Sequence, residues 1–387
     1  MFTPTYTAAL SRLSAFVPHA GSDYARLRNY DDMAHVSGLS PYIRHRIITE
    51  PDVLRAVLAR HSPQAAEKCV QEVVWRTYWK GWLELRPGIW ANYRRDLASA
   101  INQVQAQSGL RQRWEAACLG QTGIDCFDHW ATELATTGYL HNHARMWFAS
   151  IWMHTLELPW TLGADFFLRH LLDGDSASNT LSWRWVAGMQ TQGKTYLARP
   201  DNIAKYTNGR FRPAGLAQVA HPLACPPHPA RGPLPVSGTI APDLRTGLVV
   251  TEEDLSPGWL LDQVRPVATA FVRTTQARSP LQVAPQVAGF VTDAMADCHA
   301  RFGAKLGTVT FIATDDLPQW RDAHGLGQVV TSYLPVGPAA DTLRHASLVQ
   351  PIRQYDQTAW PHAHSGFFRF KDAIPKLLGQ IKGLTTA

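Results

Sequence analysis

Residues 171–188 read LLDGDSASNTLSWRWVAG, and this stretch says most about the fold. Asp173, Asp175 and Asn179 lie within seven residues, shortly before Trp183 and Trp185. Two carboxylates this close destabilise a protein unless cations or hydrogen-bond donors satisfy them. Acidic caps at the start of a helix are one explanation, because the helix macrodipole favours them. A calcium loop fits poorly, because the D-x-[DN]-x-[DN]-G spacing is missing.

A second group of chemically informative residues lies upstream of this stretch. On a helix, Glu72, Trp75, Arg76 and Trp79 are spaced i, i+3, i+4 and i+7, so they share one face. A carboxylate, a guanidinium and two indoles on one stripe could line a cleft that stacks a flat heterocycle. The alternative is an amphipathic helix with an internal ion pair.

The segment TTGYLHNHARMWFASIW, residues 136–152, contains a third group. After a Thr-Thr-Gly turn that can cap a helix start, Asn142, Arg145, Met146 and Ala149 share a face. A carboxamide, a guanidinium and a thioether in this arrangement suit the polar edge of a heterocycle. Ordinary helix packing explains the same residues, so this group is not decisive alone.

The chain divides by its hydrophobic pattern. From Tyr6 to Arg210, apolar residues recur at three and four positions, which is typical of helices. Residues 211–245 carry eight prolines and read as a semi-rigid linker. Beyond them, β-branched runs alternate with helical stretches, which indicates parallel strands joined by crossover helices. We predict a mainly α protein: a helical domain (1–210), a Pro-rich linker (211–245) and a smaller Rossmann-like α/β domain (246–387).

Composition limits the classes of protein that this chain can belong to. The 387 residues are 45% hydrophobic and 18% charged, as in an ordinary globular protein. No run of about 18 apolar residues and no leader-like N-terminus is visible, so we expect a cytoplasmic protein with no membrane span. Five cysteines show no metal-ligand spacing, so we expect neither disulfides nor a metal site. The net charge of +6 suits a polyanionic partner or an anionic cofactor.

Taken together, the three segments and two others resemble the helical flavin-binding half of the cryptochrome/photolyase family. The matching motifs occur in the family's order and cover about half the chain. They are DYARLRNYDD (23–32), VSGLSPYIRHRII (36–48), EVVWRTYW (72–79), TGYLHNHARM (137–146), Trp160 and DGDSASNTLSWRW (173–185). Relatives begin with an α/β antenna domain, whereas here the helical half comes first. The C-terminal part is similar to a shortened antenna domain, as in a circular permutation.

The resemblance implies that the helical half binds FAD. Asp173 and Arg145 match an ion pair beside the isoalloxazine ring, Asp175 matches a carboxylate at the flavin edge, and Asn179 matches the residue that faces flavin N5. Val36 and Gly38 stand where many relatives carry Thr and Arg, so phosphate contacts are expected to be fewer or rearranged. The remaining cofactor-binding positions are Tyr24, Ser37, Gly38, Leu39, Ser40 and Arg76.

The resemblance also implies electron transfer through tryptophans. Trp183 and Trp160 match the first two members of the family's electron-hopping chain. The third member is not obvious in the sequence, and Trp147, Trp152 or Trp114 could replace it.

The third implication concerns DNA. Dimer-repairing photolyases receive a flipped pyrimidine dimer among a Glu, a Trp, an Asn and a Met, and the matching catalytic positions are Glu72, Trp75, Asn142, Met146 and Trp185. These residues favour a deoxyribodipyrimidine photo-lyase that repairs cyclobutane dimers in DNA with light. A blue-light photoreceptor of the cryptochrome type and a non-photochemical flavoprotein stay open as alternatives. We expect a monomer, and an antenna chromophore is a further possible partner.

Overall fold

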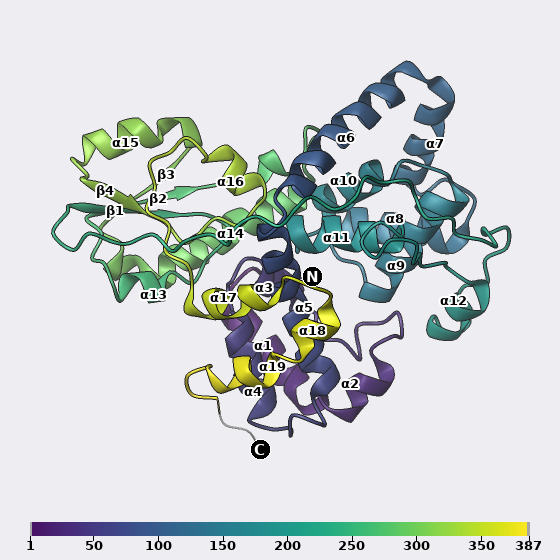
Figure 1. The fold of residues 1–387 in the computed structure, drawn as a ribbon, viewed down its shortest axis with the longest axis horizontal. Coiled ribbons are helices and arrows are strands. Elements are labelled where there is room, and N and C mark those ends of the chain that lie inside the picture. The colour runs from purple at the N-terminus through teal and green to yellow at the C-terminus, as the bar shows by residue number, and fades with distance from the viewer. Residues whose placement is uncertain (1, 385–387) are drawn as a thin grey trace.

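The first part of the chain is helical in the computed structural model, which describes residues 2–384 (Figure 1). The helical pattern predicted up to Arg210 is confirmed by elements that end at Tyr206. The helices are α1 (Tyr6–Phe16), α2 (Ser22–Leu27), α3 (Ser40–Arg44), α4 (Glu50–Leu58), α5 (Glu67–Glu84), α6 (Gly88–Ala106), α7 (Ser108–Leu119), α8 (Asp125–Thr137), α9 (Asn142–Ser150), α10 (Trp160–His170), α11 (Ser176–Val186) and α12 (Pro200–Tyr206).

Local chemistry sets several of these helix ends. Thr49 and Asp52 form a reciprocal capping box that begins α4. Asp175 begins α11, where its Oδ1 accepts a hydrogen bond from the backbone N–H of Ser178 at 2.8 Å. The acidic cap suggested by the sequence is therefore real for Asp175. Gly138 ends α8 in the left-handed region at φ 69°, which turns the chain toward α9.

Aromatic rings fill the core of the helical part. Trp130, Trp147, Trp152 and Trp183 are almost completely buried. Trp130 stacks on Trp147 with 5.4 Å between ring centroids, and Trp152 meets Trp183 edge-on at 6.2 Å. Gly163 of α10 lies against the second pair, and a Cβ there would come within 2.3 Å of Trp183 Cη2. Glycine at this position allows α10 to pack directly on the indole.

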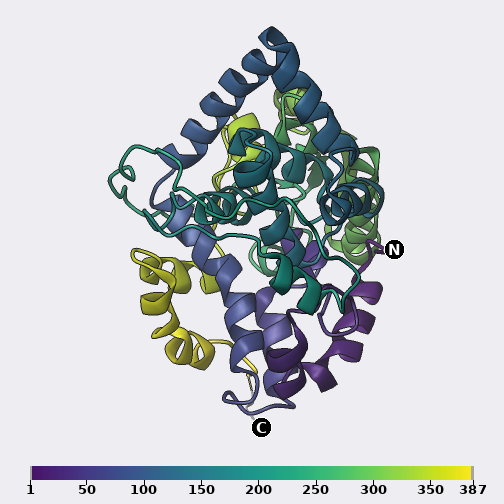
Figure 2. The ribbon, with the colours of Figure 1, turned by 90° about the vertical axis from the view of Figure 1, so that its right-hand side faces the viewer.

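Residues 207–245, all of which the structure describes, form neither helix nor strand. They run along the helical part toward the sheet (Figures 1 and 2). Backbone hydrogen bonds from Leu223 N to Ala187 O and from Gly232 N to Leu85 O hold them there. The Pro-rich segment is thus ordered and packs along the helices.

The strands form one parallel sheet in the order β3-β2-β1-β4. This confirms the predicted α/β part with a parallel sheet. The strands are β1 (Thr246–Val250), β2 (Ala268–Val272), β3 (Thr308–Ile312) and β4 (Gln328–Val330), and the helices among them are α13 (Gly258–Leu261), α14 (Pro285–Phe302), α15 (Leu317–Ala323) and α16 (Pro338–Thr342).

Helices cover both faces of this sheet (Figure 1). Leu248 and Val250 of β1 belong to the same apolar cluster as Val291 of α14, whereas Val249 belongs to the cluster of Trp320 on α15. This alternation is the two-residue period of a strand buried on both faces.

The last part of the chain returns to the helical part. Helices α17 (Gln354–Ala359), α18 (Phe367–Lys371) and α19 (Ile374–Gly379) lie beside α4 and α5, in yellow in Figures 1 and 2. A Cβ at Gly81 of α5 would lie 2.8 Å from Trp360 Cδ1, so this glycine lets the returning segment pack closely. The division of the chain at residue 246 stays a prediction, and residues 354–379 pack largely on α5.

None of the helices within residues 2–384 combines the length and apolar character needed to cross a bilayer.

Gly163→Ala should lower the free energy of unfolding by about 1–3 kcal/mol, because the new methyl group overpacks the Trp152–Trp183 contact. Gly289→Ala is the matched control inside α14, where an added Cβ has no heavy atom within 4 Å among the described residues. It should stabilise the protein by about 0.4–1 kcal/mol. Urea unfolding measures both variants, and an unchanged Gly163→Ala variant would contradict the tight packing of α10 on Trp183.

Candidate functional site

The loop of residues 171–175, between α10 and α11, carries two buried carboxylates, and we call it the acidic loop. Asp173 is 5% exposed, and Arg145 of α9 donates from Nη2 to its Oδ2 at 2.9 Å. Burial raises the pKa of Asp173, but Arg145, a hydrogen bond from Ser40 and the charge of Arg76 together hold that pKa below its ordinary value. Asp173 is therefore an ionised, firmly held carboxylate, as the sequence predicted for its pairing with Arg145.

Unsatisfied polar atoms surround this ion pair. Within residues 2–384, Asp173 Oδ1, Arg76 Nη1 and His141 Nε2 are buried and find no hydrogen-bond partner. Burial lowers the pKa of His141 to about 4 although the charge of Asp31 opposes the shift, so its ring is neutral. Its Nδ1 accepts from His143 N at 3.1 Å, which leaves the ring proton on Nε2. Two donors and one acceptor without partners mark a place where a polar ligand would form hydrogen bonds.

Tyr24 lies on α2, and Glu72 lies on α5, which packs against α2. Glu72 pairs with Arg28, and the two side chains are 32% and 26% exposed. Burial, followed by the charge of Glu72, raises the pKa of Tyr24 far above its ordinary value. Tyr24 is therefore a neutral phenol that can donate a hydrogen bond. The ion pair with Arg28 was not foreseen, because Arg28 lies on another element.

The turn of residues 37–40 leads into α3. Gly38 adopts the left-handed region at φ 59°, Ser37 Oγ accepts from Leu39 N at 3.2 Å, and Ser40 begins the helix. A Cβ at Gly38 would lie 2.7 Å from Arg12 Nη1. A guanidinium from α1 therefore lies where relatives were expected to carry their own Arg. Arg12 lies outside the motifs, so only the fold reveals it.

The expected dimer-binding residues differ in how exposed their side chains are. Asn142 is exposed at the start of α9 and Met146 is half-buried one turn later. Trp185 packs at 5.7 Å from Tyr196. Trp75, in contrast, stacks on Phe367 of α18 with 3.5 Å between ring centroids and 9° between planes. The face of this indole is covered by the returning C-terminal segment, which the sequence did not indicate.

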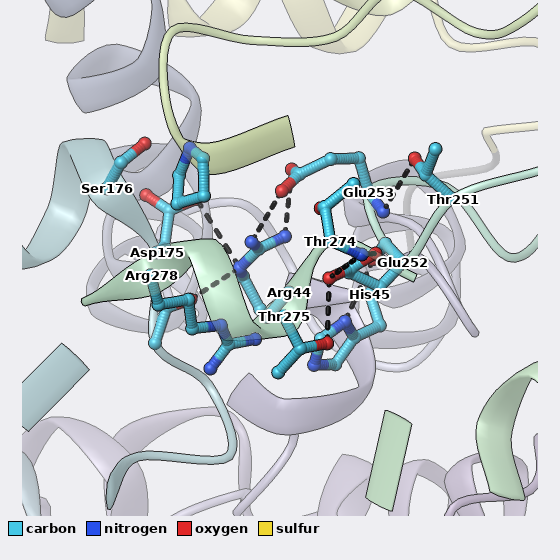
Figure 3. Close-up of polar contacts among 12 residues, drawn as sticks. Arg44, His45, Asp175, Ser176, Thr251, Glu252, Glu253, Thr274, Thr275 and Arg278 are labelled. Carbon is cyan, nitrogen blue, oxygen red and sulfur yellow. Dashed lines mark hydrogen bonds and ion pairs between the residues drawn. The ribbon is translucent and has the colours of Figure 1, made fainter. Parts of the chain in front are cut away.

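Asp175 belongs to a buried ring of alternating charges, which we call the buried ion ring and which consists of Asp175, Lys80, Glu253 and Arg44. Figure 3 labels three of its members, Arg44, Asp175 and Glu253. Lys80 Nζ lies 3.1 Å and Arg44 Nε 3.9 Å from Asp175 Oδ2. Arg44 also donates to both carboxylate oxygens of Glu253 at 2.8 and 2.6 Å, and Lys80 lies 3.8 Å from Glu253. Burial alone raises the pKa of Asp175, but Lys80 and Arg44 hold it far below its ordinary value.

Sequence reasoning missed three members of the buried ion ring. Arg44 lies in a motif quoted above, but nothing local distinguishes it from a surface cation. Lys80 follows the Glu72–Trp79 stripe by one residue. Glu253 lies in the run TEEDL after a buried strand, and an acidic run at the carboxyl end of such a strand is the one signal that could have found it.

Asn179 and the tryptophans complete the set of predicted residues. Asn179 lies one turn into α11 and donates from Nδ2 to Ala164 O at 2.8 Å. Trp183 is 5.1 Å from the ring of Phe167 and 6.2 Å from Trp152. Trp160 begins α10 and lies 5.7 Å from Tyr93.

A family model described as the FAD binding domain of DNA photolyase matches residues 69–210. The deoxyribodipyrimidine photo-lyase of Synechococcus sp. is 32% identical over 191 residues, which are 48% of this chain and 39% of that protein. The deoxyribodipyrimidine photo-lyase of Thermus thermophilus is 32% identical over 199 residues, 50% of this chain and 45% of that protein. The crystal structure of a class III photolyase from Agrobacterium tumefaciens is 26% identical with a TM-score of 0.46, covering 54% of this chain and 44% of that one.

The residues at the acidic loop fit FAD. A flavin edge offers both donors and acceptors, which matches the unsatisfied atoms of Asp173, Arg76 and His141. Arg12, next to Gly38, offers a cation for a diphosphate.

Arg145→Met should lower the free energy of unfolding by about 3 kcal/mol at pH 7, because it leaves Asp173 as an uncompensated buried charge. The folded-state pKa of Asp173 is depressed, so the pair stabilises the protein above about pH 4 and loses this effect as the pH falls further. The difference between variant and wild type should therefore shrink at low pH. Denaturant unfolding from pH 7 to pH 3.5 measures it.

Arg26→Met is the control, because the Arg26–Asp23 pair is 71% and 50% exposed. It should change stability by less than about 0.5 kcal/mol at any pH. Equal losses in the two variants would contradict the buried character of the Arg145–Asp173 pair.

Proposed function

The helical half of this chain belongs to the cryptochrome/photolyase family and binds FAD, and on that premise we propose that the protein repairs cyclobutane pyrimidine dimers in DNA with light. The chain spans less than half the length of the curated relatives reported above, so the activity of those proteins comes to this one as a proposal. The net charge of +6 is compatible with DNA as the polyanionic partner.

One observation carries the proposal: the dimer-binding candidates lie on the same helical turns as the residues at the acidic loop. Asn142 and Met146 flank Arg145, which holds Asp173, on α9. Glu72 lies one turn before Arg76 on α5, and the charge of Arg76 acts on Asp173. A substrate that contacts these side chains would therefore lie next to the flavin loop.

These residues have distinct tasks in the proposed reaction. FAD, when bound and reduced, would supply under light the electron that splits the cyclobutane ring, and the electron would return to the flavin once the ring has opened. Glu72 and Asn142 hydrogen-bond the thymine edges and stabilise the negative charge that develops there. Met146 and Trp185 provide apolar and aromatic surface, which offsets the base stacking that a flipped dimer loses. Trp183 and Trp160 supply electrons that keep the flavin reduced.

A photoreceptor is the second candidate function, and the contact between Trp75 and Phe367 favours it. A dimer that stacks on the covered face of Trp75 must first displace Phe367, whose ring lies parallel at 3.5 Å. Phe367 also packs against Tyr78 at 5.5 Å, so the returning segment is held on α5 by more than one ring. A sensor has no need to open this contact for DNA, whereas a repair enzyme does.

Glu72→Gln should lower the yield of dimer repair about tenfold while the protein keeps its flavin, because a charged hydrogen bond of about 1.5 kcal/mol is lost at the substrate. The assay illuminates the reduced protein with single-stranded DNA that contains a thymine dimer and follows the loss of the lesion. Flavin content is read from the absorption spectrum.

Glu67→Gln is the matched control on α5, where Glu67 pairs with Lys371 at an exposed position. It should repair like the wild type. A wild-type protein that binds flavin, is photoreduced and repairs no dimer would favour the photoreceptor. A colourless Glu72→Gln variant would show that Glu72 supports the cofactor and not the lesion.

Trp183→Phe should slow photoreduction of the oxidised flavin at least tenfold, because phenylalanine is much harder to oxidise than tryptophan. Transient absorption and steady-state bleaching under blue light measure the rate. Trp130→Phe is the control, since Trp130 is equally buried but lies outside the candidate electron-transfer residues. Unchanged photoreduction in Trp183→Phe would reject this route for the electron.

A further inference from the structure

Side chains that the proposed reaction does not use hold the backbone of the acidic loop by hydrogen bonds (Figure 3). Arg278, which follows β2, donates from Nη1 to Leu171 O at 3.1 Å. Arg44 donates from Nε to Gly174 O at 2.7 Å. The backbone of the loop is thus fixed at two carbonyls by buried cations, one from the α/β part and one from α3.

His45 adds a neutral contact to this arrangement. Its Nδ1 lies 2.8 Å from Glu252 O and its Nε2 lies 3.1 Å from Leu172 O. Burial, followed by the cations Arg44 and Arg278, lowers the pKa of His45 to about 3, so the ring carries one proton and donates to only one carbonyl. His45 therefore adds no charge, and the electrostatics near the loop depend on the buried ion ring.

The buried ion ring is neutral as a whole. Its two cations, Arg44 and Lys80, are 3% and 5% exposed, and its two anions, Asp175 and Glu253, are 2% and 8% exposed. Three members come from the helical part, and Glu253 alone comes from the sheet side, three residues after the end of β1. Without Glu253, Asp175 would be the one anion left in the ring beside its two cations, and one positive charge of the ring would stay uncompensated in a low-dielectric interior.

We propose that Glu253 is a positioning residue for the flavin: through the buried ion ring it balances the charge at Asp175, and the α/β part thereby sets the redox potential of the cofactor. The proposal rests on FAD binding at the acidic loop, and it does not depend on whether DNA is repaired. An uncompensated positive charge near a flavin favours the reduced form, because reduction adds negative charge. Glu253 opposes that bias because it compensates the charges of Arg44 and Lys80.

The test is a redox titration of the full-length, flavin-loaded protein. In a buffer of fixed potential near the wild-type midpoint, Glu253→Gln should raise the ratio of reduced to oxidised flavin about tenfold. Lys80→Met removes a cation from the same ring and should move the ratio in the opposite direction. The double variant Glu253→Gln/Lys80→Met restores neutrality and should return the ratio toward the wild-type value.

Glu252→Gln is the matched control. Glu252 is the buried neighbour of Glu253 but accepts from Thr274 N and Thr275 Oγ1, outside the buried ion ring. A shift in Glu253→Gln that exceeds the shift in Glu252→Gln, with opposite signs for the two single ring variants, supports the proposal. Equal shifts in both glutamate variants, or a midpoint unchanged by any ring variant, overturn it.

Two further outcomes separate this proposal from the repair activity. If Glu253→Gln does not fold, Lys80→Met and the double variant decide the sign: unchanged ratios in both overturn the proposal, and a downward shift that the double variant reverses supports it. A shifted midpoint in a protein that repairs no dimer supports this proposal and counts against repair alone. A protein that takes up no flavin overturns both.

Discussion

Charge compensation in a dry interior is the constraint on which the rest of this structure depends. Asp175 caps α11, and it can stay ionised there only because Lys80 and Arg44 lie beside it. Those two cations would be destabilising without Glu253, which arrives from the other part of the chain. The position of the acidic loop, and with it the position of Asp173, therefore depends on how the sheet edge is seated on the helices.

The sheet serves this protein differently from most open α/β sheets. Ligands commonly bind at the carboxyl ends of parallel strands, near the point where strand order reverses. Here Glu253, after β1, pairs with Arg44 and Lys80 beside Asp175, and Arg278, after β2, donates to Leu171 O of the acidic loop (Figure 3). This edge of the sheet holds the acidic loop in place, and the residues that would bind the ligand come from the helical part.

The returning C-terminal segment adds a second long-range constraint. Phe367 and Trp360 pack on α5, which also carries Glu72, Arg76 and Lys80. Helix α5 thus carries a dimer-binding candidate, Glu72, the unsatisfied donor of Arg76 beside the acidic loop, and one member of the buried ion ring, Lys80. Because Phe367 covers one face of the Trp75 ring, access to the proposed DNA pocket depends on how α18 packs on α5.

The sequence by itself determined the helical nature of residues 6–206 and the parallel sheet, because hydrophobic periodicity reports on neighbours within a few turns. Its short motifs indicated the resemblance to the FAD-binding half of photolyases. The pairing of Arg145 with Asp173 was implied by the resemblance of two separate motifs to the family, and not by any local pattern. The tertiary structure alone decided that Arg44 meets Glu253, 209 positions away, that Arg12 lies against Gly38, and that Phe367 covers Trp75. These contacts depend on how separate elements pack, and a pattern that repeats every two or 3.6 residues carries no information about which distant side chain will arrive.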